Sequence, residues 1–422
     1  MNNSIKLTLT LLKRSGKETS LFITILTLVS ALIFNFTNLT LISEITYSSP
    51  SEKTILSYLL IFILGESLFV LYNADNYLTK IKSDEFALQV LSGASPYKLG
   101  ILLTIQITIL NIIGCTLGTI LGIIISPLFY LFIFGKFGFY ISLTTFLYCF
   151  IFACFQTIIL GLVNQGFGYR NDIKALLGIN DKSQFTSNTF EETLKLKHYI
   201  CFPLMFSVFI LFFMSPNSIT QIKDIISFLF LIPLIGGTLF YNKFLPLYID
   251  KLKKNKYLNH KINVIVLSNF KTSLEKNKVV FQPLLVIGIA FPMLPILLEG
   301  TSLIYLFISL SFLICILLLT FMIIFYGLST SIDEIKTLKS LTVLGYSKED
   351  LLKIVRNKIL LLYGTLLALP LFFTSVFTAF LVLYLDFSLG LSIIFIGSYI
   401  TLFLISTSII YSLSIKLLNQ IS

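Results

Sequence analysis

The side chains that could carry out chemistry in this chain are few and scattered. Five cysteines occur without CxxC spacing, and only His198 and His260 could supply imidazole, so neither a disulfide framework nor a metal site is predicted. No GxxxxGK[ST] segment occurs, which excludes a phosphate-binding loop of that kind. We therefore expect no catalytic residues and no cofactor bound by this chain. If ATP and Mg²⁺ drive its work, a separate subunit must hydrolyse the ATP.

Glu66 is a carboxylate near the middle of the apolar run 55–74. A charged group at the centre of a bilayer costs about 2.5–3.5 kcal/mol on insertion scales, so this side chain must face protein or water, or be protonated. Two roles remain open. Glu66 binds a cation or couples to protons, or it forms structural hydrogen bonds, with Asn35, Gln106 or Asn111 as its partners.

Small residues form a stripe in the apolar run 101–128. Gly114, Gly118 and Gly122 make two overlapping GxxxG motifs, and glycines four apart present a flat surface to which another helix can come close. We expect these glycines to pack helices, with a ligand contact as the alternative. Gly364 and Ala368 predict a milder version of the same stripe in the second half of the chain.

The surrounding elements are those of a membrane protein. The chain is 56% hydrophobic and 12% charged, with a mean hydropathy of +0.92, whereas soluble domains are about 45–50% apolar and about 25% charged. The fifth and sixth of its apolar runs are short and contain Pro203 and Pro233, so they either span or are re-entrant. We predict an all-α polytopic membrane protein with about ten spans: 21–41, 55–74, 101–128, 140–163, 200–214, 225–241, 279–298, 303–328, 359–385 and 391–413.

The distribution of basic residues predicts the orientation of these spans. With the N-terminus inside, 28 of the 31 Lys and Arg residues fall in the inner connections, and only Lys53, Lys136 and Lys223 are outside. Cytoplasmic connections carry such an excess, so both termini are expected to be cytoplasmic. The basic residues that give the chain its net charge of +11 then border the membrane, where anionic lipid attracts them. No nucleic-acid partner is therefore expected.

The chain contains an internal repeat. LTLLKRSGKETSLFI precedes the first apolar run and LSNFKTSLEKNKVVF precedes the seventh; Lys13 and Lys271 are 258 positions apart, and Gly93 and Gly345 are 252 apart. Each copy predicts four spans in the same orientation, so two further spans must lie between the copies. We therefore expect a first membrane repeat at 1–163, a two-span insert with basic linkers at 164–261, and a second repeat at 262–422.

A connector on the inner side recurs in both copies, at about 83–95 and 333–347. In each, apolar residues at helical spacing precede a glycine, and a serine two residues later is placed to cap the next helix. Each connector thus predicts a short amphipathic helix, a glycine stop, a serine cap and a new helix. Two interpretations remain open: an interfacial helix that rests on the inner leaflet, or a symmetric pair of docking surfaces.

The connectors carry a resemblance to a known family. Glu85, followed by Gly93-Ala94-Ser95, is similar to the cytoplasmic E-x-x-x-L-x-x-x-G-x-S signature of FtsX/MacB-type ABC transporter permeases. Two four-span units joined by a two-span insert resemble more specifically the BceB-type permeases of Gram-positive bacteria, as does the segment 341–348, LTVLGYSK. One departure is large: where those permeases have a big extracellular domain between spans seven and eight, this chain has only residues 299–302.

The resemblance implies a multi-pass protein of the cell membrane that works with a cytoplasmic ABC ATPase, present in two copies and holding the ATP and Mg²⁺. A sensor kinase or a small accessory membrane protein is a further expected partner, beside membrane lipid. The residues implied to couple to the ATPase are Glu85, Leu88, Leu91, Gly93 and Ser95 in the first connector, and Glu334, Leu338, Leu341, Leu344, Gly345 and Ser347 in the second.

Two functions from different classes are therefore predicted. The first is the permease subunit of an ABC transporter acting on an amphipathic substrate, such as an antimicrobial or exported peptide or a lipid-linked molecule. The alternative is an ion-coupled secondary transporter in which Glu66 is the coupling group. Inverted-topology repeats are usual in secondary transporters, whereas these copies are parallel. An intramembrane enzyme is a distant third.

Overall fold

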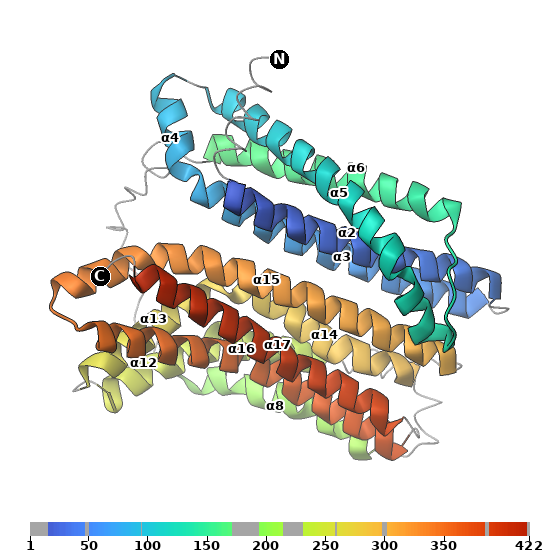
Figure 1. Cartoon of the computed structure of the whole chain (residues 1–422). Coiled ribbons are helices and arrows are strands. Elements are labelled where there is room, and N and C mark those ends of the chain that lie inside the picture. Colours follow the sequence, from blue (N-terminus) through green and yellow to red (C-terminus); the bar gives the residue numbers. More distant parts are fainter. Residues whose placement is uncertain are drawn as a thin grey trace. The chain divides into compact units, whose positions relative to one another are not determined.

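The computed structural model of the chain is a set of long helices (Figure 1). It describes residues 16–46, 50–93, 95–170, 194–213, 231–257, 260–297, 302–384 and 388–419, and within these ranges every regular element is helical. The contacts divide the chain into two compact units, Met1–Asn188 and Thr189–Ser422. The described helices of the insert belong to the second unit.

The described residues of the first unit form four long helices and one short one. Its third long helix shows how local signals set the boundaries: Ser95 caps its start, Pro96 occupies the first turn, and Gly135 ends it at a φ of 66°. The helices are α2 (Gly16–Thr46), α3 (Pro50–Ile81), α4 (Ser83–Leu91), α5 (Pro96–Phe134) and α6 (Leu143–Arg170).

The closest helix contact in this unit joins α2 to α5. A Cβ atom added at any of the three stripe glycines of α5 would lie 2.4–2.9 Å from a side chain of α2. Both partners advance by four residues together, so the two helices run parallel along this seam. The facing pairs are Gly114 with Leu26, Gly118 with Ser30, and Gly122 with Phe34.

Helix α6 is bonded to the other helices of the unit by polar contacts along its length. Near its start, Asn38 of α2 donates to the Tyr140 carbonyl (2.7 Å) and accepts from the Ser142 N–H (3.0 Å). Further along, Gln156 of α6 donates to Asn111 of α5 (2.7 Å). In its most apolar stretch only 17% of the residues of α6 are buried, against 56% for α2.

The second unit is built around four helices that follow the insert. Tyr399 of α17 donates a hydrogen bond to the Leu284 carbonyl of α14 (3.2 Å), and the Phe312 ring of α15 packs 4.3 Å from that of Phe395. Its described helices are η1 (Leu196–Ile200), α8 (Cys201–Phe206), η2 (Ser207–Phe213), α11 (Leu231–Leu239), the π-helical η3 (Phe240–Phe244), α12 (Leu245–Asn255), α13 (Lys261–Lys276), α14 (Lys278–Leu297), α15 (Ser302–Val343), α16 (Lys348–Tyr384) and α17 (Leu389–Asn419).

Seven helices in the described ranges are long and apolar enough to cross a membrane, or eight if the bent pair Lys261–Lys276 and Val280–Pro295 forms one span. This confirms the prediction of an all-α, multi-pass membrane protein. The fifth predicted span overlaps the short apolar helix Leu196–Ile210. Of the sixth, residues 225–230 lie outside the described residues, and the rest is the short helix α11 with the start of η3. The prediction that another helix packs closely against Gly364 is wrong, because a Cβ added at this glycine would meet no atom within 4 Å.

Candidate functional site

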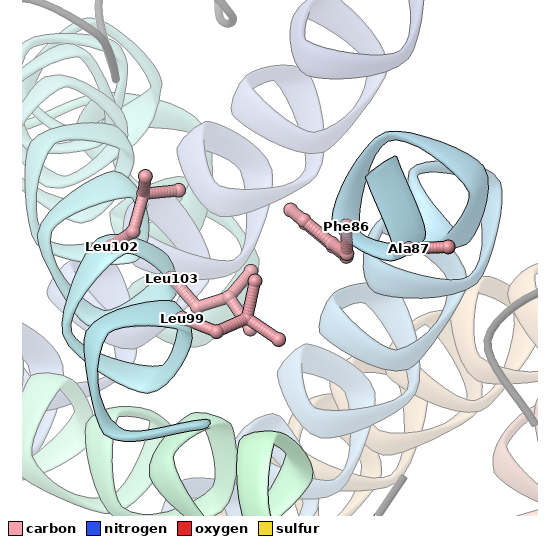
Figure 2. Packing of buried hydrophobic residues seen from close by; sticks show 5 residues of the cluster. All are labelled: Phe86, Ala87, Leu99, Leu102 and Leu103. Atoms are coloured by element: carbon pink, nitrogen blue, oxygen red, sulfur yellow. The ribbon is translucent and has the colours of Figure 1, made fainter. Parts of the chain in front are cut away.

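The first connector is built around α4, which packs on the start of α5. Phe86 and Ala87 of α4 are fully buried, and the Phe86 ring points toward Leu99, Leu102 and Leu103 of α5, whereas Ala87 points away from them (Figure 2). The contact of Phe86 joins the short helix to the beginning of α5. The outer face of α4, with Leu88 and Leu91, remains free of the core.

The chain then reverses through a glycine and a serine cap. Gly93 has a φ of 93°, a conformation that favours glycine, and its N–H donates to the Val90 carbonyl (3.0 Å). The Ser95 hydroxyl accepts from the Lys98 N–H (3.4 Å) at the start of α5. The connector presents Leu88 and Leu91 outward, with exposed fractions of 66% and 59%.

The second connector has the same turn chemistry. Gly345 has a φ of 88°, its N–H donates to the Thr342 carbonyl (3.0 Å), and the Tyr346 N–H donates to the Leu341 carbonyl (3.2 Å), which together form a Schellman motif. The Ser347 hydroxyl accepts from the Asp350 N–H (3.2 Å) and caps α16. Both connectors therefore have a glycine stop followed by a serine cap.

The helix that precedes this second turn differs from the prediction. A separate short helix was expected, but α15 runs without interruption from Ser302 to Val343. Leu338 is buried and Leu341 is half-buried, whereas Leu344 is 73% exposed. The backbone of Glu334 lies in α15, and its side chain is outside the described residues. In the first connector, Glu85 has one carboxyl oxygen buried without a hydrogen-bond partner.

Glu66 is buried in α3, with 7% of its surface exposed, and its Oε2 has no hydrogen-bond partner. None of the three amides expected near it bonds to it. Asn35 donates to the Ala31 carbonyl of its own helix, Asn111 bonds to Gln156, and both polar atoms of the Gln106 amide are buried without partners. The structural hydrogen-bonding role that the sequence allowed is therefore not observed with these residues.

A second buried carboxyl group was missed by the sequence analysis. Asp75 of α3 is 1% exposed and accepts from the Asn164 amide of α6 at 3.4 Å. The bond joins the ends of two helices that are far apart in sequence. The cluster of polar residues in the segment YNADNY, which ends the second apolar run, was the available signal. Within the described ranges, no group of three or more His, Cys, Asp or Glu side chains could hold a metal ion.

The chain was also compared with known proteins. No protein-family model matches it, and no curated protein matches it. Its function must therefore be argued from the two connectors and from the helices to which they are attached.

Proposed function

We propose that this protein is the membrane permease subunit of an ABC transporter, which couples ATP hydrolysis by a separate ATPase to the movement or removal of an amphipathic substrate. One observation carries the proposal: each unit contains a turn of the same construction, with a left-handed glycine, a serine cap and an exposed leucine beside them. A pair of equivalent apolar surfaces suits a partner that is itself present in two copies. Exposed leucines are suitable contacts because a docking partner would remove them from water.

The first connector is mechanically suited to transmit a push from such a partner. Phe86 is buried against α5, and Ser95 begins that helix, so α4 and the start of α5 move together. The glycine seam then joins α5 to α2 along its length. A displacement applied at α4 would therefore tilt two membrane helices.

The proposal includes the finer arrangement expected from the sequence. The chain would cross the membrane ten times as two FtsX-like repeats with an insert between them, with both termini in the cytoplasm of a Gram-positive bacterium. The expected outer connections are too short to form a recognition domain. The substrate would therefore be met inside the bilayer, as suits a membrane-active peptide, an exported peptide or a lipid-linked molecule that partitions there first.

Co-purification with the ATPase tests this function. Leu91→Asp and Leu344→Asp each place a charge in the proposed contact, and an unpaired charge buried at an interface is costly. Both positions are exposed, so folding should be almost unaffected. Lys251→Asp, at an exposed position in α12, is the control for an added carboxylate. Loss of the ATPase from the two leucine variants alone would support the proposal, and its normal retention by both would contradict it.

One observation favours the alternative of an ion-coupled secondary transporter. The Glu66 carboxyl group is buried in a membrane helix with an oxygen that has no partner, which is a suitable position for a proton or cation site. Proteoliposomes containing this chain alone should then take up substrate under an imposed ion gradient, and Glu66→Gln should abolish that uptake. Uptake that needs the ATPase would exclude the alternative.

A further inference from the structure

A half-open hollow of about 360 Å³ lies between α2, α5 and α6 of the first unit. Its size is within the range of about 300–1,000 Å³ that is usual for small-molecule sites. Ile33 and Gln156 are buried at its floor, whereas Phe150, 71% exposed, lies at its mouth. We call it the α5–α6 groove. A smaller hollow of about 190 Å³ shares Ile33 and Phe152 with it but is bounded by α3.

The polar side chains that line the groove are already hydrogen-bonded within the protein. The Ser30 hydroxyl donates to the Cys115 thiol (3.5 Å), and the Thr119 hydroxyl donates to a carbonyl of its own helix (2.8 Å). The Gln156 amide donates to Asn111 (2.7 Å). Aromatic and aliphatic side chains make up most of the remaining wall. A polar ligand would therefore find few free hydrogen-bonding groups here, whereas an apolar chain would leave no hydrogen bond unmade.

The groove opens where the surrounding medium is hydrocarbon. Its α5 and α6 residues lie inside the candidate spans Tyr97–Phe134 and Leu143–Gly166. The exposed neighbours on both helices are apolar, among them Leu117 and Ile120 on α5 and Ile151 on α6. Water does not fill an apolar space of this kind, and an empty space would forfeit dispersion contacts along its walls. The available material to fill it is a lipid chain.

We propose that the α5–α6 groove holds one acyl chain of a membrane phospholipid, seated between the aromatic residues of α6 and the stretch of α5 that contains Cys115 and Thr119. The lipid would be a resident part of the first unit and would fill the hollow between α2, α5 and α6. This inference goes beyond the proposed function and does not depend on an ATPase or on a transported substrate.

A photoreactive lipid tests the assignment. The protein is placed in nanodiscs that contain phosphatidylglycerol with a diazirine in its acyl chain, irradiated, digested and mapped by mass spectrometry. The yield of cross-links at groove residues is expected to be several-fold above the yield at Ile124 and Ile158. These two isoleucines are exposed to lipid but do not line the groove. Because the surrounding lipid is as apolar as the groove, shape rather than hydrophobicity produces this enrichment.

Two variants fill the groove and one serves as the control. Ala153→Phe adds a ring at the half-buried wall, and Thr116→Phe does so at an exposed position where folding is tolerant of change. Either should reduce the groove cross-links several-fold without affecting those at Ile158. Ile158→Phe, outside the groove, should leave them unchanged.

Three results would overturn the assignment. Uniform cross-linking along the exposed faces of α5 and α6 would mean ordinary surrounding lipid. A dimer in the nanodiscs together with no groove cross-links would mean that a second copy of the chain covers the groove. Loss of the groove cross-links when an unlabelled membrane-active peptide is added would assign the site to transported substrate. The first two results leave the proposed function untouched, because no ATPase is present, whereas the third would support its expected class of substrate.

Discussion

The glycine seam between α2 and α5 makes a strong prediction about stability. In a Gly118→Ala variant the new Cβ would lie 2.5 Å from the Ser30 Cβ and 2.8 Å from the Thr27 carbonyl oxygen, so the two helices must separate. Overpacking of this kind costs about 1–3 kcal/mol. The change also removes a helical glycine, which alone is favourable by about 1 kcal/mol. The Gly118→Ala substitution should therefore lower the free energy of unfolding by roughly 0–2 kcal/mol.

Gly364→Ala separates these two contributions. It is also a helical position, in α16, but an added Cβ would meet no atom within 4 Å. This variant should keep the helical gain without the clash, so the two variants should differ by the overpacking cost of about 1–3 kcal/mol. On the scale of soluble domains of 150–250 residues, each kcal/mol shifts Tm by about 2–4 °C.

The assay must suit a membrane protein that contains no tryptophan. A fluorescent fusion, heated in detergent and then passed over a sizing column, reports the fraction of protein that remains monodisperse at each temperature. Gly118→Ala should have a Tm several degrees below that of Gly364→Ala. Equal Tm values for the two variants would refute the close contact between α2 and α5.

The same assay checks three further predictions. Gly93→Ala should lower stability by about 1–2 kcal/mol through backbone strain alone, because the added Cβ has open space but the φ of 93° disfavours alanine; an unchanged Tm would argue against this turn. Asn38→Ala should cost about 1–3 kcal/mol, since it leaves the Tyr140 carbonyl and the Ser142 N–H unpartnered. Asn35→Ala, which loses only a bond within its own helix, is its control, and an equal loss in both variants would contradict the role of Asn38. Glu66→Gln should keep the Tm and the expression level, because no observed hydrogen bond is lost; a clear fall would show that the carboxyl group has a partner.

The sequence predicts the membrane helices well because their signal is strong and local. The third apolar run, 101–128, lies within α5, which extends from Pro96 to Phe134. The extra turns at both ends follow from Ser95, whose capping role the sequence predicts, and from Gly135, which the structure shows as the left-handed end of the helix. The connectors are similar: a glycine between two helices predicts a left-handed residue, and both Gly93 and Gly345 adopt one.

The rest depends on how each helix is rotated, which spacing alone does not determine. Glu66, Asn35 and Asn111 were grouped because all are polar and intramembrane, yet Asn111 faces α6 and bonds to Gln156. Gly364 shares the pattern of Gly118 but has no close neighbour. The break between α3 and α4, and its absence in α15, also follow no visible rule, since neither segment contains Gly or Pro at that place.

Helix α5 links the three features that matter most in the first unit. Its start is fixed to the first connector by the contact with Phe86, its middle is locked against α2 by Gly118 and its neighbours, and its other side forms one wall of the groove. Because the seam has side chains of α2 seated over the glycines, α5 cannot slide along α2 without steric clash. A push on the connector would therefore move α2 and α5 as one body. Helix α6 is in turn bonded to α5 at several points, because Asn111 bonds to Gln156 and Thr104 donates to the Gly161 carbonyl. A push on the connector would therefore be passed on through α5 to α6 as well.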